Sequence, residues 1–272
     1  MPLDLDSLPM HLFQRSQQRM WQPAALDYSR ERACWMALDD RERELLLRLV
    51  SGFVVGERGV THELAPLQQA LRRQRGWMEE EMYLAAQLFE EAKHVEFFQR
   101  WLDAALPGVF GRDIPYPELQ GDLFSERLPA AMQALWQDDS DHAKVRAIVT
   151  YHQYVEGVGA EASYPIFFDL LGGRDIFPAL HQGIQLVRRD EARHIAFGVY
   201  LLQRLLERDP GLRPTWEAEL ASFGEYLDEG PLQTFAPFGS DVPFGLDPEK
   251  YRALFREKFE EQRRAVDERV LA

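Results

Sequence analysis

Two short segments of the chain place a glutamate three residues before a histidine. Glu91 and His94 lie in LFEEAKHVEFF, and Glu191 and His194 lie in RRDEARHIAFG. Positions three apart share one face of a helix, so each pair would present a carboxylate and an imidazole side by side. Both pairs also stand in apolar seams where leucines would otherwise face the core. Because a buried carboxylate is costly unless it is paired or metal-bound, the pattern favours a carboxylate-bridged dimetal site.

Two further carboxylates interrupt apolar seams in the same way. Glu57 is the charged position in the seam of a helix expected over 39–75, and Glu156 stands on the seam of a helix expected over 138–171. Four inward acids can balance two divalent cations, and with two imidazoles they match the ligand plan of ferritin-like di-iron and di-manganese bundles. Oxygen-rich ligation with two imidazoles suits iron or manganese better than zinc.

Several other polar side chains could support such a site. Asp190, beside Glu191, could accept the outer N–H of a ligating histidine, or it could form an ion pair with Arg188 or Arg193. Trp21 could close one end of the site, or it could simply pack as an aromatic residue. Three histidines lack a comparable partner pattern and are interpreted as structural or exposed: His62, His152 and His181.

The spacing of apolar residues predicts that these side chains are carried mainly by helices. Residues 1–38 are punctuated by prolines and are expected to form an irregular arm with short helical pieces. A looser segment is expected from about 107 to 123, where Pro115 and Pro117 disfavour a long helix. The expected helices, with a turn around Gly76, cover 39–75, 77–106, 125–137, 138–171, 175–208, 214–229 and 247–270.

No strand pattern or repeat interrupts these helices, so we predict one all-α domain over 1–272. Its fold class would be a ferritin-like four-helix bundle core with additional helices and an N-terminal arm. We divide the chain into the arm at 1–38, a dimetal helical core at 39–208 and C-terminal flanking helices at 209–272.

Composition narrows the possible functions. The 272 residues carry a formal net charge of −14 with both signs interspersed, which disfavours binding to nucleic acid. The single cysteine, Cys34, excludes an internal disulfide framework and favours a reducing compartment. Neither a signal peptide nor a run of eighteen apolar residues is present in the sequence, so we expect no transmembrane segment and a cytoplasmic protein.

At EEAKH, YHQYVEG and DEARH the sequence resembles the ribonucleotide reductase small-subunit superfamily, and it is most similar to the R2-like ligand-binding oxidases. The likeness runs from WQPAALDYSRERA through DEARHIAFG and weakens after about residue 210. It implies an oxidoreductase with one manganese and one iron ion, although a di-iron site would also fit. The manganese ligands implied are Glu57, Glu91 and His94; those of iron are Glu91, Glu156, Glu191 and His194, with Glu91 as the bridge.

The resemblance also implies O2 activation that forms an ether cross-link. The two cross-linked positions of the family are Val60 in GERGVT and Tyr151 in YHQYVEG; without the family, core packing and a buried phenol would be the default interpretations. It further implies a long-chain fatty acid or similar apolar ligand, with Tyr164 bordering its tunnel or packing in the core. A homodimer is expected as well.

Two other functions remain open at this point. A ribonucleotide reductase small subunit usually carries a radical tyrosine four residues after the first histidine, and Phe98 stands there. A storage ferritin would hold iron without oxidising an organic substrate, but such bundles are shorter and lack the arm. Acyl-carrier-protein desaturases and arylamine oxygenases share the ligand plan and resemble the chain less.

Overall fold

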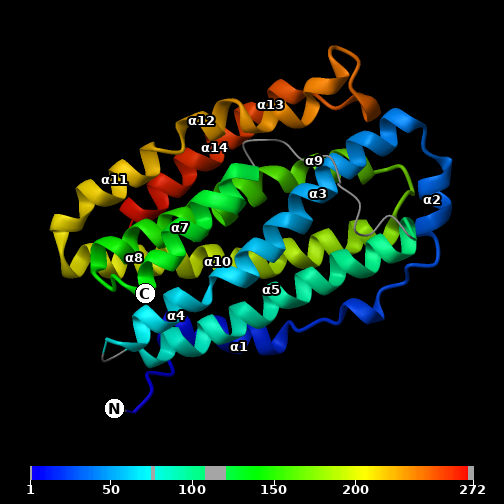
Figure 1. The fold of residues 1–272 in the computed structure, drawn as a ribbon. Helices are drawn as coiled ribbons and strands as arrows, with labels where there is room; N and C mark the ends of the chain where they lie inside the picture. The colour runs from blue at the N-terminus through cyan, green and yellow to red at the C-terminus, as the bar shows by residue number, and fades with distance from the viewer. Residues whose placement is uncertain (1, 75–76, 108–120, 269–272) are drawn as a thin grey trace.

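The computed structural model describes residues 2–74, 77–107 and 121–268, and these ranges contain helices but no strand. Long helices run roughly side by side through the molecule (Figure 1). The predicted all-α, ferritin-like class is therefore confirmed. The four segments that form the bundle are α3 (Asp40–Glu63), α5 (Met78–Ala105), the continuous stretch from Asp141 to Leu171, and α10 (Pro178–Arg208).

The first core helix is shorter than predicted. A capping box begins α3, because the side chain of Asp39 accepts from the Glu42 amide at 2.9 Å while the Glu42 side chain accepts from the Asp39 amide at 3.0 Å. The helix expected over 39–75 is divided at Leu64 into α3 and α4 (Ala65–Arg72). Pro66 explains the division, since it lacks an amide N–H to continue the helical ladder. The turn expected around Gly76 lies outside the described residues.

The segment expected as one α-helix over 138–171 is helical throughout but not uniformly α. It consists of α8 (Asp141–Ile148), the π-helix η4 (Val149–Ala160) and α9 (Glu161–Leu171). Residues 149–158 of η4 are all buried, so this stretch has no solvent-exposed face. The prediction of an α-type seam was wrong here, because the wider π-helical turn changes which side chains share a face.

The N-terminal arm lies along the bundle. Helices α1 (Leu8–Gln18) and α2 (Glu31–Ala37) both pack against α5, and the short 3-10 turn η1 (Pro23–Ala25) lies between them. Figure 1 shows this blue segment following α5 along much of its length. The arm is thus helical in short pieces, as predicted, and it covers one side of the helices that carry the predicted ligands.

The remaining predicted helices are present with different bounds. The one over 125–137 is a π-turn, a short helix and a 3-10 turn: η2 (Leu123–Arg127), α7 (Leu128–Gln133) and η3 (Ala134–Trp136). Of the two predicted flanking helices, the one over 247–270 is confirmed as α14 (Pro248–Asp267), and the one over 214–229 is divided into α11 (Arg213–Ala221) and α12 (Gly224–Asp228). The short helix α13 (Gly230–Phe235) was not predicted. Most of the looser segment with Pro115 and Pro117 lies outside the described residues. Among the described helices, none has the length and apolarity that crossing a membrane requires.

One buried carboxylate attaches the arm to the bundle. Glu31 of α2 is fully buried, and it accepts from the Trp101 indole at 2.5 Å and from the Ala179 amide at 2.9 Å. Ala179 lies in the first turn of α10, whose amides have no partners within the helix. Glu31 therefore joins three elements, α2, α5 and α10, at one end of the bundle.

We predict that Glu31→Ala lowers the free energy of unfolding by about 2–4 kcal/mol, because two buried donors lose their acceptor. Chemical denaturation of both proteins would measure the change. The control is Glu96→Ala, which removes an exposed acid that pairs with Arg100 at 2.7 Å, and which should cost less than about 1 kcal/mol. Equal losses in the two variants would contradict the role of Glu31.

Candidate metal centre

The predicted ligands from four helical segments converge in the middle of the bundle. Two groups of side chains each have ligand atoms within 4.8 Å of one another, and Glu91 and Glu191 belong to both groups. All members are buried. The first group is Glu57, Glu91, His94 and Glu191; the second is Glu91, Glu156, Glu191 and His194.

Both histidines present Nδ1 to this cluster. The Nδ1 of His94 lies 3.3 Å from Glu57 and 3.2 Å from Glu191. The Nδ1 of His194 lies 3.1 Å from Glu91 and 3.6 Å from Glu156. Each imidazole therefore faces two or more carboxylates with the same ring nitrogen, which leaves Nε2 to contact the protein behind it.

The outer nitrogens meet acids in a crossed arrangement. His94 of α5 directs Nε2 to Asp190 of α10 at 3.4 Å, and His194 of α10 directs Nε2 to Glu90 of α5 at 3.0 Å. Each acid immediately precedes the inward glutamate on its own helix. Glu90 was not predicted from the sequence, although the acid pairs EE and DE before the two histidines are a visible signal for it. Such acids fix the tautomer and orientation of a ligating histidine.

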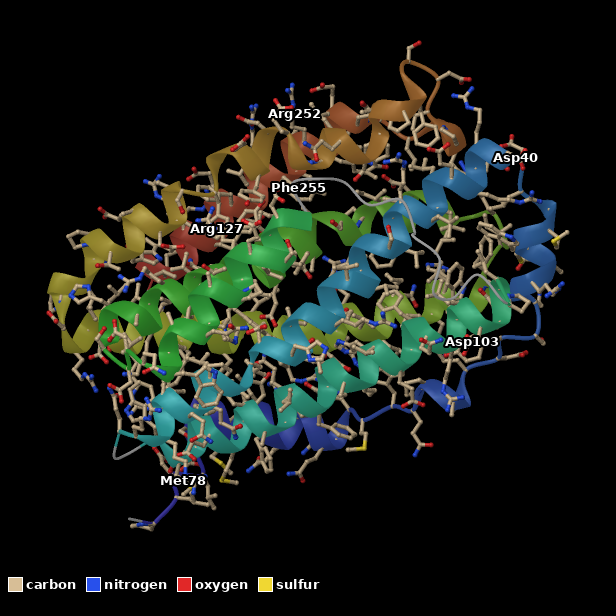
Figure 2. All side chains as sticks on the ribbon, viewed as in Figure 1. Asp40, Met78, Asp103, Arg127, Arg252 and Phe255 are labelled. Carbon is tan, nitrogen blue, oxygen red and sulfur yellow. The ribbon has the colours of Figure 1, made fainter. Side chains whose placement is uncertain are left out.

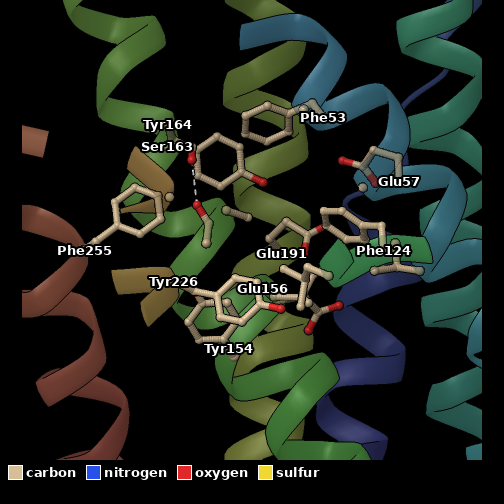
Figure 3. Close-up of a pocket in the computed structure, with 18 of the residues that line it drawn as sticks. Phe53, Glu57, Phe124, Tyr154, Glu156, Ser163, Tyr164, Glu191, Tyr226 and Phe255 are labelled. Carbon is tan, nitrogen blue, oxygen red and sulfur yellow. Dashed lines mark hydrogen bonds between the residues drawn. The ribbon is translucent and has the colours of Figure 1, made fainter. Parts of the chain in front are cut away.

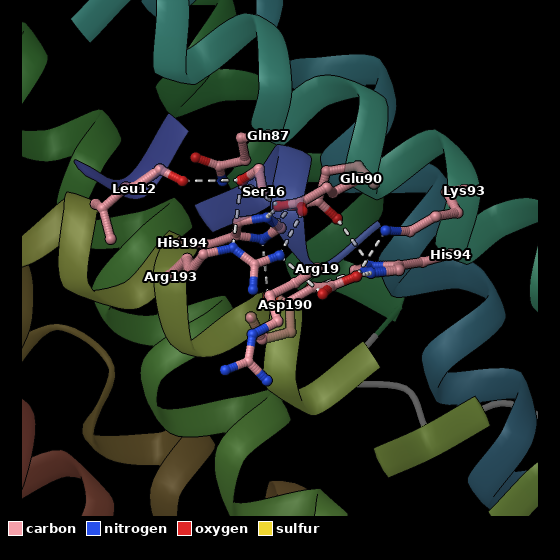
Figure 4. A network of polar contacts seen from close by, with 12 residues as sticks. Leu12, Ser16, Arg19, Gln87, Glu90, Lys93, His94, Asp190, Arg193 and His194 are labelled. Carbon is pink, nitrogen blue, oxygen red and sulfur yellow. Dashed lines mark hydrogen bonds and ion pairs between the residues drawn. The ribbon is translucent and has the colours of Figure 1, made fainter. Parts of the chain in front are cut away.

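Asp190 and Glu90, the acids behind the two histidines, belong to a buried ionic network (Figure 4). Asp190 accepts from the Trp21 indole at 2.6 Å and from Lys93 at 2.7 Å. Both alternatives foreseen for Asp190 occur together, since it also pairs with Arg193 at 2.8 Å. Arg193 bridges from Asp190 to Glu90.

The arm closes this side of the cluster. The Trp21 ring stacks on His94 with centroids 6.3 Å apart, while Lys93 lies 5.0 Å from the Trp21 ring. Arg188 pairs with Glu161 rather than with Asp190. Its Nε and Nη2 lie 3.2 and 3.1 Å from the two carboxylate oxygens of Glu161. Trp21 therefore acts both as a packed aromatic and as a hydrogen-bond donor behind a candidate ligand.

Several inward polar atoms lack a hydrogen bond in this arrangement. Buried atoms without a partner include one oxygen each of Glu57, Glu91 and Glu156, together with Nδ1 of His94. Buried polar atoms are normally satisfied, so a concentration of unsatisfied oxygen and nitrogen donors needs an explanation. A pair of divalent cations provides one, because carboxylates and imidazoles are their usual ligands. The residues present fit a dimetal site.

In the absence of metal ions, burial and neighbouring charges shift the pKa values of the cluster residues so that several of them hold a proton. Burial raises the pKa of Glu57 to about 8, and it also raises the pKa of Glu156 well above its usual range. Burial acts in the same direction on Glu91, but the nearby imidazoles outweigh it and hold the Glu91 pKa well below its usual value. For His94 and His194, neighbouring carboxylates outweigh burial and raise both pKa values well above 6.5.

The two residues predicted to cross-link lie close together beside the cluster. The Tyr151 hydroxyl lies 3.2 Å from Glu91 and donates toward the backbone carbonyl of Val60 at 3.4 Å. Both side chains are buried. The phenolic oxygen is therefore next to both a candidate bridging ligand and the residue expected as its cross-linking partner.

A largely apolar pocket opens from the carboxylates (Figure 3). The space between its lining residues, including the part that is open to solvent, is about 800 Å³. Tyr164 lines this pocket, and its buried hydroxyl has no partner. Other lining residues include Phe53 and Val60 of α3, Phe124 of η2, Tyr226 of α12 and Phe255 of α14.

The remaining histidines have different environments. His62 is exposed and His181 is half-buried, with a contact of 3.2 Å to Gln185. His152 is fully buried and contacts Gln87 at 3.3 Å. Neither Gln87 nor this contact was foreseen, because an uncharged amide in a helix gives no pattern of its own.

Comparison with known proteins agrees with this geometry. Residues 9–222 match the family described as ribonucleotide reductase, small chain. A structure of R2-like ligand-binding oxidase with aerobically reconstituted Mn/Fe cofactor has 29% identity and a TM-score of 0.88, over 97% of this chain and 94% of that one. A tyrosine-to-phenylalanine mutant of such an oxidase, also with aerobically reconstituted Mn/Fe cofactor, has 30% identity and a TM-score of 0.86 over the same shares.

We predict that metal binding releases protons. Metal ligands must be deprotonated, whereas Glu57 is protonated below about pH 8 and both cluster histidines carry raised pKa values. Apparent affinity should therefore rise between pH 6 and 8, about tenfold per pH unit for each proton displaced. Anaerobic calorimetric titration with Mn(II), in two buffers of different ionisation enthalpy, counts the protons. Binding without proton release across this range would contradict the prediction.

Proposed function

Because this chain belongs to the ribonucleotide reductase small-chain family, and within it to the R2-like ligand-binding oxidases, we propose that its cluster holds one manganese and one iron ion and uses O2 as an oxidant. One observation carries the proposal: two buried ligand groups share Glu91 and Glu191 at the centre of the bundle. Shared carboxylates can bridge two cations. The relatives described above carry Mn/Fe cofactors.

The ligand assignment follows the two groups. Glu57, Glu91 and His94 would hold manganese, and Glu91, Glu156, Glu191 and His194 would hold iron. Glu191 also lies within reach of the first group, so it could serve both positions. The same donors suit two iron ions, since ligand type does not separate iron from manganese. When bound, the reduced metals supply the capacity to reduce O2 and to oxidise a nearby bond.

In this proposal the side chains around the cluster orient the two imidazoles and exclude water. Asp190 and Glu90 orient the two imidazoles, while Lys93 and Arg193 balance the charge of these outer acids. Trp21 covers this side of the cluster through its stack on His94. Oxidation of an unactivated C–H bond requires a target held close in a site from which water is excluded. The buried side chains near Glu91 meet this requirement.

We infer that the cluster oxidises its own protein by joining Val60 to Tyr151. The new bond links the β-carbon of Val60 to the phenolic oxygen of Tyr151. One C–H bond and one O–H bond break, two electrons and two protons leave the side chains, and O2 accepts them. The support is local: the Tyr151 hydroxyl lies 3.4 Å from the Val60 carbonyl and 3.2 Å from Glu91.

Peptide mass spectrometry tests this oxidation. Protein loaded anaerobically with Mn(II) and Fe(II) and then exposed to air should yield a linked peptide pair that is two hydrogens lighter than the separate peptides. The pair should be absent from anaerobic samples and from Tyr151→Phe. Tyr154→Phe is the matched control, because Tyr154 is a buried tyrosine one turn away that packs on Phe223 at 4.0 Å, and it should retain the link. Unlinked peptides after complete metal oxidation would favour a reductase subunit or a ferritin-like role.

We also propose that the pocket holds a long-chain fatty acid or a similar apolar ligand with a polar head. The apolar walls suit a hydrocarbon chain, and the head would face the carboxylates and any metals bound there. Tyr164 would meet the ligand near that end, since its hydroxyl is buried and without a hydrogen bond. A homodimer and a cytoplasmic location, both expected from the sequence, remain predictions.

Organic extracts of the purified, metal-loaded protein should contain about one long-chain acid per chain, detected by mass spectrometry. Gly56→Phe should lower this yield several-fold, because Gly56 lines the pocket and an added β-carbon would already lie 3.3 Å from Phe124. Gly224→Ala, at a position with nothing within 4 Å of an added β-carbon, should leave the yield unchanged. A clean extract from fully metallated wild-type protein would count against the ligand.

A further inference from the structure

A buried amide contacts one of the candidate ligands from outside both metal groups. Gln87 of α5 is fully buried and lies one helical turn before Glu91 (Figure 4). Its Nε2 donates to Oε1 of Glu156 at 3.0 Å, across the space between α5 and η4. Oε2 of Glu156 is buried and has no hydrogen-bond partner. The two oxygens of this carboxylate are therefore not equivalent.

The orientation of the Gln87 amide is set by a second residue. Its Oε1 lies 3.3 Å from Nε2 of His152, a buried histidine on η4. As a metal ligand Glu156 must be ionised, and an ionised carboxylate can only accept, so the amide nitrogen then faces Glu156 and the amide oxygen faces His152. His152 then carries its proton on Nε2 and donates to Gln87. Nδ1 of His152 has no partner, which is consistent with this tautomer.

Tight packing holds His152 in this position. A β-carbon at Gly198 of α10 would lie 2.1 Å from the β-carbon of His152, so glycine at 198 is what allows the two segments to approach this closely. The His152 ring also contacts Tyr151, with centroids 4.6 Å apart, and Phe197 at 6.1 Å. His152 has little freedom to turn away from Gln87.

From this geometry we propose that Gln87 and His152 are positioning residues for Glu156: the hydrogen bond from Gln87 to Oε1 would hold this carboxylate toward Nδ1 of His194, 3.6 Å away, as a ligand of the second metal. The inference rests on the proposed ligation by Glu156. Neither residue touches a metal in this account. Hydrogen bonds to ligating carboxylates commonly determine their orientation, and losing one typically weakens metal binding 10–100-fold.

The test is anaerobic Fe(II) binding, read by equilibrium stoichiometry and by Mössbauer spectra of ⁵⁷Fe. Gln87→Met keeps the length of the side chain but removes the donor. It should weaken binding of one of the two iron equivalents about 10–100-fold and alter the spectrum of that iron. The other equivalent should keep wild-type affinity. His152→Leu, which leaves Gln87 in place, should produce the same spectral change with a smaller loss of affinity.

Gln153→Met is the matched control. Gln153 is an equally buried amide on η4, but it bonds away from the cluster, to Trp216 at 2.8 Å and to the Gln262 carbonyl at 3.1 Å. Its loss should lower the melting temperature without altering the iron spectrum. The double variant of Gln87 and His152 should bind iron no more weakly than Gln87→Met alone, since His152 acts through Gln87.

Iron binding by the wild-type protein tests the proposed metal site, whereas iron binding by the variants tests the role of Gln87 and His152. Wild-type protein that binds no iron would contradict the metal site itself, and the inference with it. Wild-type protein that binds two equivalents, together with a folded Gln87→Met that matches it in affinity and spectrum, would overturn the inference alone. The same holds if Gln153→Met shifts the iron spectrum as much as Gln87→Met does.

Discussion

The burial of several carboxylates at one point is the constraint on which this structure depends. Glu57, Glu91, Glu156 and Glu191 meet in the centre of the bundle, where isolated charge is strongly disfavoured. Without metals the protein reduces this cost by protonation, as the raised pKa values of Glu57 and Glu156 show. Two divalent cations would remove the need for those protons. The folded bundle is therefore arranged around carboxylates whose charge is offset by bound protons when metals are absent and would be offset by cations when they are bound.

The polar residues behind the two histidines hold this buried cluster in place. Asp190 and Glu90 connect each histidine to the opposite helix, so α5 and α10 are joined twice through the cluster. These acids add more negative charge, and Lys93 and Arg193 offset it at short range. The arm completes this layer by donating the Trp21 indole to Asp190. Removing Lys93 or Arg193 would leave a buried acid with less compensating charge, whereas Trp21 adds a neutral hydrogen bond that attaches the arm to the same acid.

The sequence predicted which acids and histidines converge better than it predicted the bounds of the helices that carry them. Glu57 and Glu191 could be found because a charge in an apolar seam is conspicuous, whatever the local helical geometry. Glu90 was missed because it is one of several adjacent acids, and its role depends on a contact with another helix. The π-helix was missed because residues 149–158 are all buried, so no exposed polar face in the sequence marks the period of the helix. Pro66 was present as a signal for a helix boundary but was not given enough weight.

The two sides of the cluster differ in a way that bears on its chemistry. On the side of the arm, charged and hydrogen-bonded groups fix both histidines. On the opposite side, the apolar pocket reaches Glu57, Glu91, Glu156 and Glu191 but neither histidine. Three of these acids, all except Glu191, have a buried oxygen without a partner. The carboxylates with a free oxygen therefore line the pocket. The histidines, whose outer nitrogens are held by acids, lie against the ionic network. Val60, the residue proposed for oxidation, lies on the pocket side.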